Sequence, residues 1–230
     1  MKGILYAGMV IVAGFCVGIV VWLWSGRAPP AAAPVFHAPY PNPHLSLLVE
    51  PHDGIGQVLS LINHATTSVD LVMYELTDTT IEKALVAAAH RGVSVRVLLN
   101  KGYYGDPEAK VPLNQQAYTY LSANGVLTQW TPASFALTHE KLLIADSGAL
   151  IMGFNLTPAY YATSRDFAVS DTDARDIRAL ESVFDADWSA TSSDTVQAIA
   201  NEGADLVWSP GSESALLSLI ASAQHAIVMN

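Results

Sequence analysis

Residues 138–146 read Thr138-His139-Glu140-Lys141-Leu142-Leu143-Ile144-Ala145-Asp146, and residues 151–157 read Ile151-Met152-Gly153-Phe154-Asn155-Leu156-Thr157. The apolar runs at 141–145 and 149–152 are each typical of a buried strand, and Ser147-Gly148 between them predicts a hairpin turn. His139 lies just before the first run, and Asn155 follows the second. Because a hairpin brings the outer ends of its two strands together, these two side chains are expected to meet.

The side chains of this hairpin favour chemistry at phosphorus. His139 and Lys141 are two residues apart, so they share a face in an extended chain. A neutral imidazole offers a lone pair that can attack phosphorus, Lys a point charge, and Asn an amide donor. A zinc site is not favoured, because the H-E-x-x-H motif that His139 would begin has Leu143 at the second ligand position. We therefore expect a phosphodiester site with no metal and no other cofactor.

The pattern H-x-K-x4-D with a downstream Asn resembles the signature of the phospholipase D superfamily. The resemblance implies that His139 is the nucleophile and becomes transiently phosphorylated, while Lys141 and Asn155 hold the non-bridging phosphate oxygens. It also implies that Asp166, eleven positions after the Asn, orients the histidine. Asp146 is expected to support the site from behind. The family usually has Ser two positions before the Asn, and this chain has Gly153.

The residues around the motif predict an α/β domain over residues 45–190, with a mixed sheet flanked by helices as in phospholipase D. Thr79 or Thr80 is expected to cap the second of its helices. The predicted strands are 45–50, 68–76, 93–99, 126–130, 141–145, 149–152 and 165–169, and the predicted helices are 55–64, 81–91, 111–123 and 173–188.

The N-terminal residues are not typical of a globular domain. Residues 4–24 carry no charge and are long enough to cross a bilayer, so residues 1–27 are expected to be a membrane anchor or signal segment, with an uncleaved transmembrane helix favoured. Residues 28–44 contain six prolines and predict an extended linker. The catalytic domain is therefore expected to be membrane-anchored and extracytoplasmic, either periplasmic or extracellular.

The last thirty residues resemble the start of the domain. Residues 216–223 match residues 58–65, and Pro210 corresponds to Pro51, so residues 201–230 predict the start of an incomplete second repeat. A second strand is expected at 226–229. No second His-Lys-Asp motif is present in the chain. In the family two motifs form one site, so a homodimer is the expected source of the second histidine.

The charge balance bears on the substrate. Residues 35–230 contain nine Lys and Arg against 21 Asp and Glu, a net charge of −12, which disfavours binding to nucleic acid. The favoured hypothesis is a phospholipase D-like phosphodiesterase that hydrolyses or transfers phospholipid phosphodiesters. Two alternatives stay open. One is an exported endonuclease with the same catalytic residues, and the other is a catalytically inactive, truncated half-protein.

Overall fold

The computed structural model describes residues 42–102, 112–190 and 205–227. The described residues divide into two units, one within Ala38–Leu206 and the other containing residues 207–227. The first unit holds the whole sheet and the hairpin of the motif.

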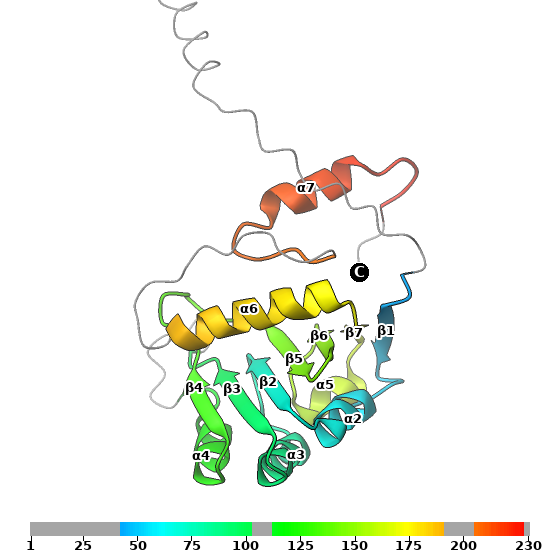
Figure 1. Cartoon of the computed structure of the whole chain (residues 1–230). Coiled ribbons are helices and arrows are strands. Elements are labelled where there is room, and N and C mark those ends of the chain that lie inside the picture. The colour runs from blue at the N-terminus through cyan, green and yellow to red at the C-terminus, as the bar shows by residue number, and fades with distance from the viewer. Residues whose placement is uncertain (1–41, 103–111, 191–204, 228–230) are drawn as a thin grey trace, which may run out of the picture. The chain divides into compact units, whose positions relative to one another are not determined.

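The sheet has seven strands in the order β1-β7-β6-β5-β2-β3-β4 (Figure 1). Strands β2, β3 and β4 run parallel, whereas β5 is antiparallel to β2, and β6, β7 and β1 continue the antiparallel half. The sheet is therefore mixed, and the motif hairpin β5–β6 joins its two halves. The strands are β1 (Leu45–Glu50), β2 (Ser68–Met73), β3 (Ser94–Leu99), β4 (Leu127–Trp130), β5 (Lys141–Ala145), β6 (Gly148–Met152) and β7 (Asp166–Asp171).

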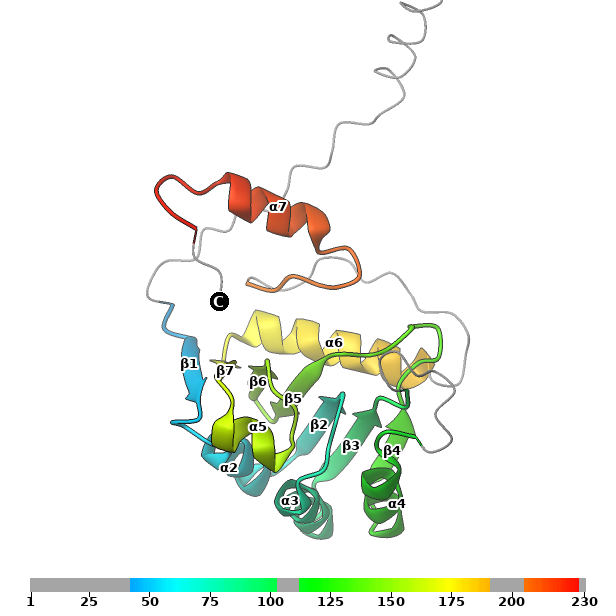
Figure 2. The same ribbon diagram turned by 180° about the vertical axis from the view of Figure 1, so that it is seen from behind.

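Helices cover both faces of the sheet. The long helix α6 lies on one side, and α2, α3, α4 and α5 lie on the other (Figures 1 and 2). The main apolar core includes Leu71 and Leu143 from the central strands together with Ile62 of α2 and Leu85 of α3, all four fully buried. The helices of this unit are α2 (Gly56–His64), α3 (Thr79–His90), α4 (Gln115–Ala123), α5 (Pro158–Thr163) and α6 (Ala174–Ala190).

The predicted α/β fold, with a mixed sheet flanked by helices, is confirmed, and each of the seven predicted strands is present. Several element bounds differ by a few residues, and the helix predicted at 111–123 begins at Gln115. Strand β2 ends at Met73, not at 76, and the short helix α5 was not predicted. The cap of α3 is neither Thr79 nor Thr80 but Asp78, whose carboxylate accepts a hydrogen bond of 2.7 Å from the backbone N–H of Thr80. Carboxylates are among the strongest N-caps, which explains this start point.

The predicted membrane segment at 4–24 and most of the predicted linker at 28–44 lie outside the described residues. In the ranges that the structure does describe, no helix has the length and apolar character that crossing a membrane requires.

The second unit contains α7 (Glu213–Ala221), at the place where a helix was expected. Its leucines at 216, 217 and 219 are about half exposed. The described residues of the strand expected at 226–229, namely 226 and 227, do not form a strand. The peptide bonds before Pro51 and Pro210 are both cis.

Candidate active site

The sheet brings the predicted phosphate-binding residues to one edge. Lys141, the first residue of β5, is paired with Met73, the last residue of β2. Asn155 follows the end of β6 and Asp166 begins β7, and alternation of strand direction places both at the same edge as Lys141. This is the carboxyl edge of the parallel strands, where α/β proteins commonly bind ligands.

Two buried asparagines fix the backbone at this edge. The side-chain amide of Asn114 donates to the carbonyl oxygens of Tyr74 and Asn100, each at 2.8 Å, and its oxygen accepts from the N–H of Leu76. Asn100 in turn accepts a bond of 3.0 Å from the N–H of Thr138. The segment leading into the motif is thereby tied to the ends of β2 and β3.

His139 and Lys141 are in direct contact. The Lys141 ammonium nitrogen lies 3.2 Å from His139 Nδ1 and donates to the His139 carbonyl oxygen at 2.8 Å. The imidazole ring lies 4.7 Å from the ring of Tyr74, measured between centroids, and the ammonium lies 5.6 Å from the same ring. Lys141 is 5 % exposed, whereas His139 is open to solvent. An accessible imidazole beside a buried cation suits attack on an anionic phosphodiester.

The surroundings of His139 favour the neutral form of its imidazole. Burial, and then the positive charge of Lys141, lower the pKa of His139 below its ordinary value of 6.5. Burial also lowers the pKa of Lys141, and the negative charge of Asp166 opposes that shift. A neutral imidazole retains the lone pair that a nucleophile requires.

Asn155 lies beside an acidic residue that the sequence did not single out. Its amide nitrogen is 3.4 Å from a carboxylate oxygen of Glu75. The Asn155 side chain is 5 % exposed, and within the described chain its Oδ1 has no hydrogen-bond partner. Glu75 and Tyr74 both follow directly after β2. Their position after a central parallel strand is the signal that marks them as site residues.

Asp166 packs against Gly153. Its Oδ1 accepts a 2.9 Å bond from the N–H of Phe167, and no described hydrogen bond joins Asp166 to His139. A Cβ atom at position 153 would overlap this carboxylate oxygen and lie 3.2 Å from the Phe167 carbonyl oxygen. Gly153, in place of the usual Ser, therefore leaves room for this orientation of Asp166.

Gly153→Ala is expected to destabilise the protein by about 1–3 kcal/mol, because the new methyl group must displace the Asp166 carboxylate. In an Asp166→Ala background the obstructing carboxylate is gone and only the tight contact with the Phe167 carbonyl oxygen remains, so the same substitution should cost less. A double-mutant cycle measured by urea unfolding gives the coupling. Equal costs of Gly153→Ala in the two backgrounds would show that the carboxylate is not the obstacle.

Asp146 supports the motif hairpin at its turn. It lies at the opposite end of β5 from Lys141, in the hairpin turn, with φ +50°. Its carboxylate accepts bonds from the N–H groups of Thr66, Thr67 and Ser68 and from the Thr66 hydroxyl, at 2.9–3.1 Å. Asp146 therefore joins the hairpin turn to the loop between α2 and β2, one strand length away from the phosphate-binding residues.

The pKa of Glu140, between the two motif residues, is influenced by a second carboxyl group. Burial, and then the charge of Asp187 on α6, raise the pKa of Glu140 from 4.5 to about 7. Burial raises the pKa of Asp187 from 3.8 to about 6. Both groups bind protons more strongly in the folded protein than in the unfolded chain. The folded protein therefore loses stability as the pH rises through the interval from about 4 to 7.

Glu140→Gln is expected to raise the melting temperature more at pH 8 than at pH 5, because Gln cannot carry the buried charge that accumulates in this interval. Thermal unfolding at both pH values checks this. The exposed Glu213→Gln is the matched control and should show the same small change at both. A stabilisation by Glu140→Gln that does not depend on pH would contradict the assignment.

Within the described residues, no group of three or more His, Cys, Asp or Glu side chains is placed to hold a metal ion.

Comparisons with known proteins agree with the resemblance of the motif to phospholipase D. A family model described as "Cardiolipin synthase, PLD-like domain" matches residues 58–188, more than half of the chain. The chain belongs to the phospholipase D superfamily. Members of this superfamily are phosphodiesterases, and the matched range of this PLD-like domain contains all five predicted site residues.

Solved structures resemble the PLD-like domain. Nuc from Salmonella typhimurium, a phospholipase D family member, is 26 % identical, with a TM-score of 0.53, over 64 % of this chain and 95 % of Nuc. NucT from Helicobacter pylori is 18 % identical, with a TM-score of 0.54, over 64 % of this chain and 96 % of NucT. Polyphosphate kinase from Porphyromonas gingivalis shares the fold at 16 % identity and a TM-score of 0.59, over 77 % of this chain and 30 % of the kinase. A comparison with curated protein sequences gives no match.

Proposed function

We propose that this chain is a phosphodiesterase that hydrolyses, or transfers, phospholipid phosphodiesters through a phosphohistidine at His139. The observation that carries the proposal is the contact of a neutral, accessible imidazole with the buried Lys141 ammonium in a domain of the phospholipase D superfamily. The cation attracts the anionic diester and stabilises the charge that develops on its non-bridging oxygens.

The reaction proceeds in two displacements at phosphorus. The lone pair of the His139 imidazole forms a bond to phosphorus while the bond to the leaving alkoxide oxygen breaks, and a general acid protonates that oxygen. Lys141 and the Asn155 amide bind the non-bridging oxygens. The group that gave up its proton as general acid then takes a proton from water, whose oxygen attacks phosphorus while the phosphorus–nitrogen bond breaks and the imidazole is released. An alcohol in place of water gives transfer of the phosphatidyl group.

The general acid would come from a second motif. The chain contains one His-Lys-Asp motif, so a homodimer that brings two His139 side chains to one phosphate would supply both nucleophile and acid. Formation of the site by two chains makes the specific activity dependent on protein concentration.

Three features favour a phospholipid over a nucleic acid. The matching family model is described by the name of a lipid-forming enzyme, cardiolipin synthase. Residues 35–230 carry a net charge of −12, from nine basic and 21 acidic residues, which repels a polyanion. The apolar segment at 4–24 would anchor the domain at a membrane, with its active site extracytoplasmic.

The experiment measures hydrolysis by the full chain in detergent, with EDTA present. A chromogenic phosphodiester reports activity, and phosphatidylcholine vesicles and supercoiled plasmid DNA divide the substrate classes. We expect the rate to rise more steeply than linearly with protein concentration, and lipid to be cleaved in preference to DNA. Plasmid cleavage without lipid cleavage would establish an endonuclease, and absence of any activity at every concentration would identify an inactive half.

A further inference from the structure

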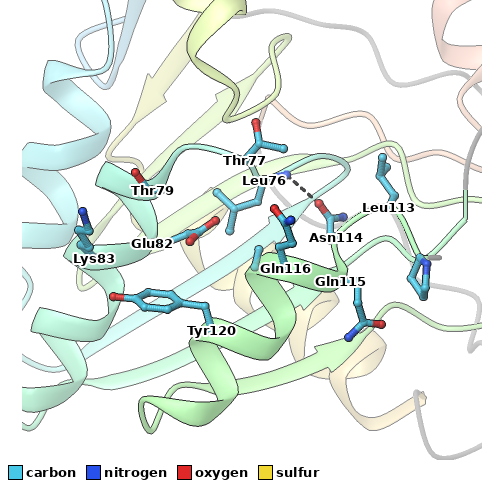
Figure 3. Close-up of a pocket in the computed structure, with 12 residues that line it drawn as sticks. Leu76, Thr77, Thr79, Glu82, Lys83, Leu113, Asn114, Gln115, Gln116 and Tyr120 are labelled. Carbon is cyan, nitrogen blue, oxygen red and sulfur yellow. Dashed lines mark hydrogen bonds between the residues drawn. The ribbon is translucent and has the colours of Figure 1, made fainter.

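A cavity of about 500 Å³ lies between α3 and α4, at the same edge of the sheet as the phosphate-binding residues (Figure 3). Its volume is within the range of small-molecule sites. The walls come from the first turns of both helices and from the segments that precede them. Its polar lining residues include Thr77, Thr79, Glu82, Gln116 and Tyr120.

Glu82 is the unusual member of this lining. It is 8 % exposed, and its carboxyl group points from α3 towards Gln116 of α4 (Figure 3). No hydrogen bond or ion pair of its carboxylate occurs in the described chain. Burial, and then the negative charge of Asp78, raise the pKa of Glu82, and Lys83 only opposes this shift. The residue is largely buried, but its carboxylate oxygens are not among the fully buried atoms that lack a partner, so they open into the cavity, where a ligand can supply the missing partner.

The charged groups around Glu82 determine which ligand charge is favoured in the cavity. Asp78 caps α3 and adds a second negative charge beside Glu82, and the exposed Lys83, which also lines the cavity, forms no described ion pair with Glu82. A protonated amine satisfies both the charge and the hydrogen-bonding capacity of a carboxylate. The Thr and Gln side chains of the lining can accept the remaining hydrogen atoms of an ammonium group.

The cavity is connected to the phosphate-binding residues through two short contacts. Leu76, in its wall, forms a parallel bridge with Leu156, the residue after Asn155. The hydroxyl of Thr77, also in the wall, donates to the hydroxyl of Thr157 at 3.0 Å. On the other side of this segment, Glu75 contacts Asn155. The cavity wall is therefore in contact with the residues that follow Asn155, and this is the basis for directing one substituent of a bound diester towards the cavity.

We propose that this cavity binds the primary-ammonium end of a phosphodiester substrate, with Glu82 as its counter-ion. The inference rests on the proposed phosphodiesterase function and specifies its substrate class, an amine-bearing phosphodiester of the phosphoethanolamine type.

Binding is measured separately from turnover. The full chain with His139→Ala is titrated calorimetrically with glycerophosphoethanolamine and with the same diester carrying an ethyl group in place of aminoethyl. We expect the amine diester to bind roughly tenfold more tightly, the size of effect that one charge-assisted hydrogen bond gives. Adding Glu82→Gln should abolish this preference, and adding Glu213→Gln, at an exposed site of α7, should leave it unchanged.

Equal affinity for the two diesters, or a preference that survives Glu82→Gln, overturns the inference. A parallel assay follows hydrolysis of the p-nitrophenyl ester of ethyl phosphate by the protein with His139 intact, and this substrate has no amine. Failure of that hydrolysis while Glu82-dependent binding persists overturns the proposed function but not the amine site. Hydrolysis of this ester together with equal binding of the two diesters overturns the amine site but not the proposed function.

Discussion

His139→Ala is expected to lower kcat/KM for a phosphodiester by roughly 10⁴-fold or more, the scale of loss when a covalent nucleophile is removed. The imidazole is accessible, its pKa is lowered by partial desolvation and by the charge of Lys141, and it lies beside that ammonium group. Alanine removes the attacking lone pair and leaves the cation in place, so binding of the diester should persist. Steady-state kinetics with a chromogenic diester would show a collapse of kcat with a smaller change in KM.

The matched control is His90→Ala, because His90 is an exposed residue at the last position of α3. It should retain the parent activity. A second measurement follows the covalent intermediate directly, by alkaline quenching and mass spectrometry of the peptide that contains residue 139. Phosphorylation of that peptide in the parent protein is expected, and its absence together with full activity of His139→Ala would exclude the mechanism.

Much of this site follows from local sequence pattern. Two apolar runs around a short turn predict a hairpin. A hairpin places residues 139 and 155 at the same edge of the sheet, independently of the order of the other strands. The contact between His139 and Lys141 follows from their spacing of two. These predictions need no knowledge of long-range packing.

The residues that sequence analysis missed depend on where elements end. Tyr74 and Glu75 continue the pattern of β2, so they were assigned to the strand, but β2 pairing stops at Met73 and both side chains join the site. Asp78 was overlooked as the α3 cap because the neighbouring threonines are also good caps. Element boundaries are determined by tertiary contacts as well as by propensity.

Other features depend on partners distant in the sequence. The raised pKa of Glu140 requires burial and Asp187, which α6 brings from the far end of the domain. The role of Asp146 requires the loop at 66–68, nearly eighty residues earlier. No spacing rule links these residues. Sequence pattern therefore grouped Asp146 with the motif residues, whereas its hydrogen bonds are made at the other end of β5.

Asp146→Ala is expected to destabilise the protein by roughly 3 kcal/mol, because it removes a carboxylate that accepts four hydrogen bonds at the hairpin turn. Alanine also tolerates the positive φ of this position poorly, whereas Asn tolerates it well. Asp146→Asn should therefore be intermediate. Urea unfolding at pH 7 measures all three proteins. Asp185→Ala, at a 60 % exposed carboxylate paired with Arg96, is the matched control and should cost less than about 1 kcal/mol.

The pH dependence distinguishes the carboxylate's charge from its shape. Burial raises the pKa of Asp146, but the hydrogen bonds from Thr66, Ser68 and Thr67 outweigh that effect and lower the pKa from 3.8 to about 2. A lowered pKa contributes stability above pH 4 that is lost as the pH falls towards 2. The parent protein's advantage over Asp146→Ala should therefore shrink between pH 7 and pH 3. An unchanged advantage would assign the effect to backbone conformation, and loss of kcat in fully folded Asp146→Ala would return this residue to the catalytic site.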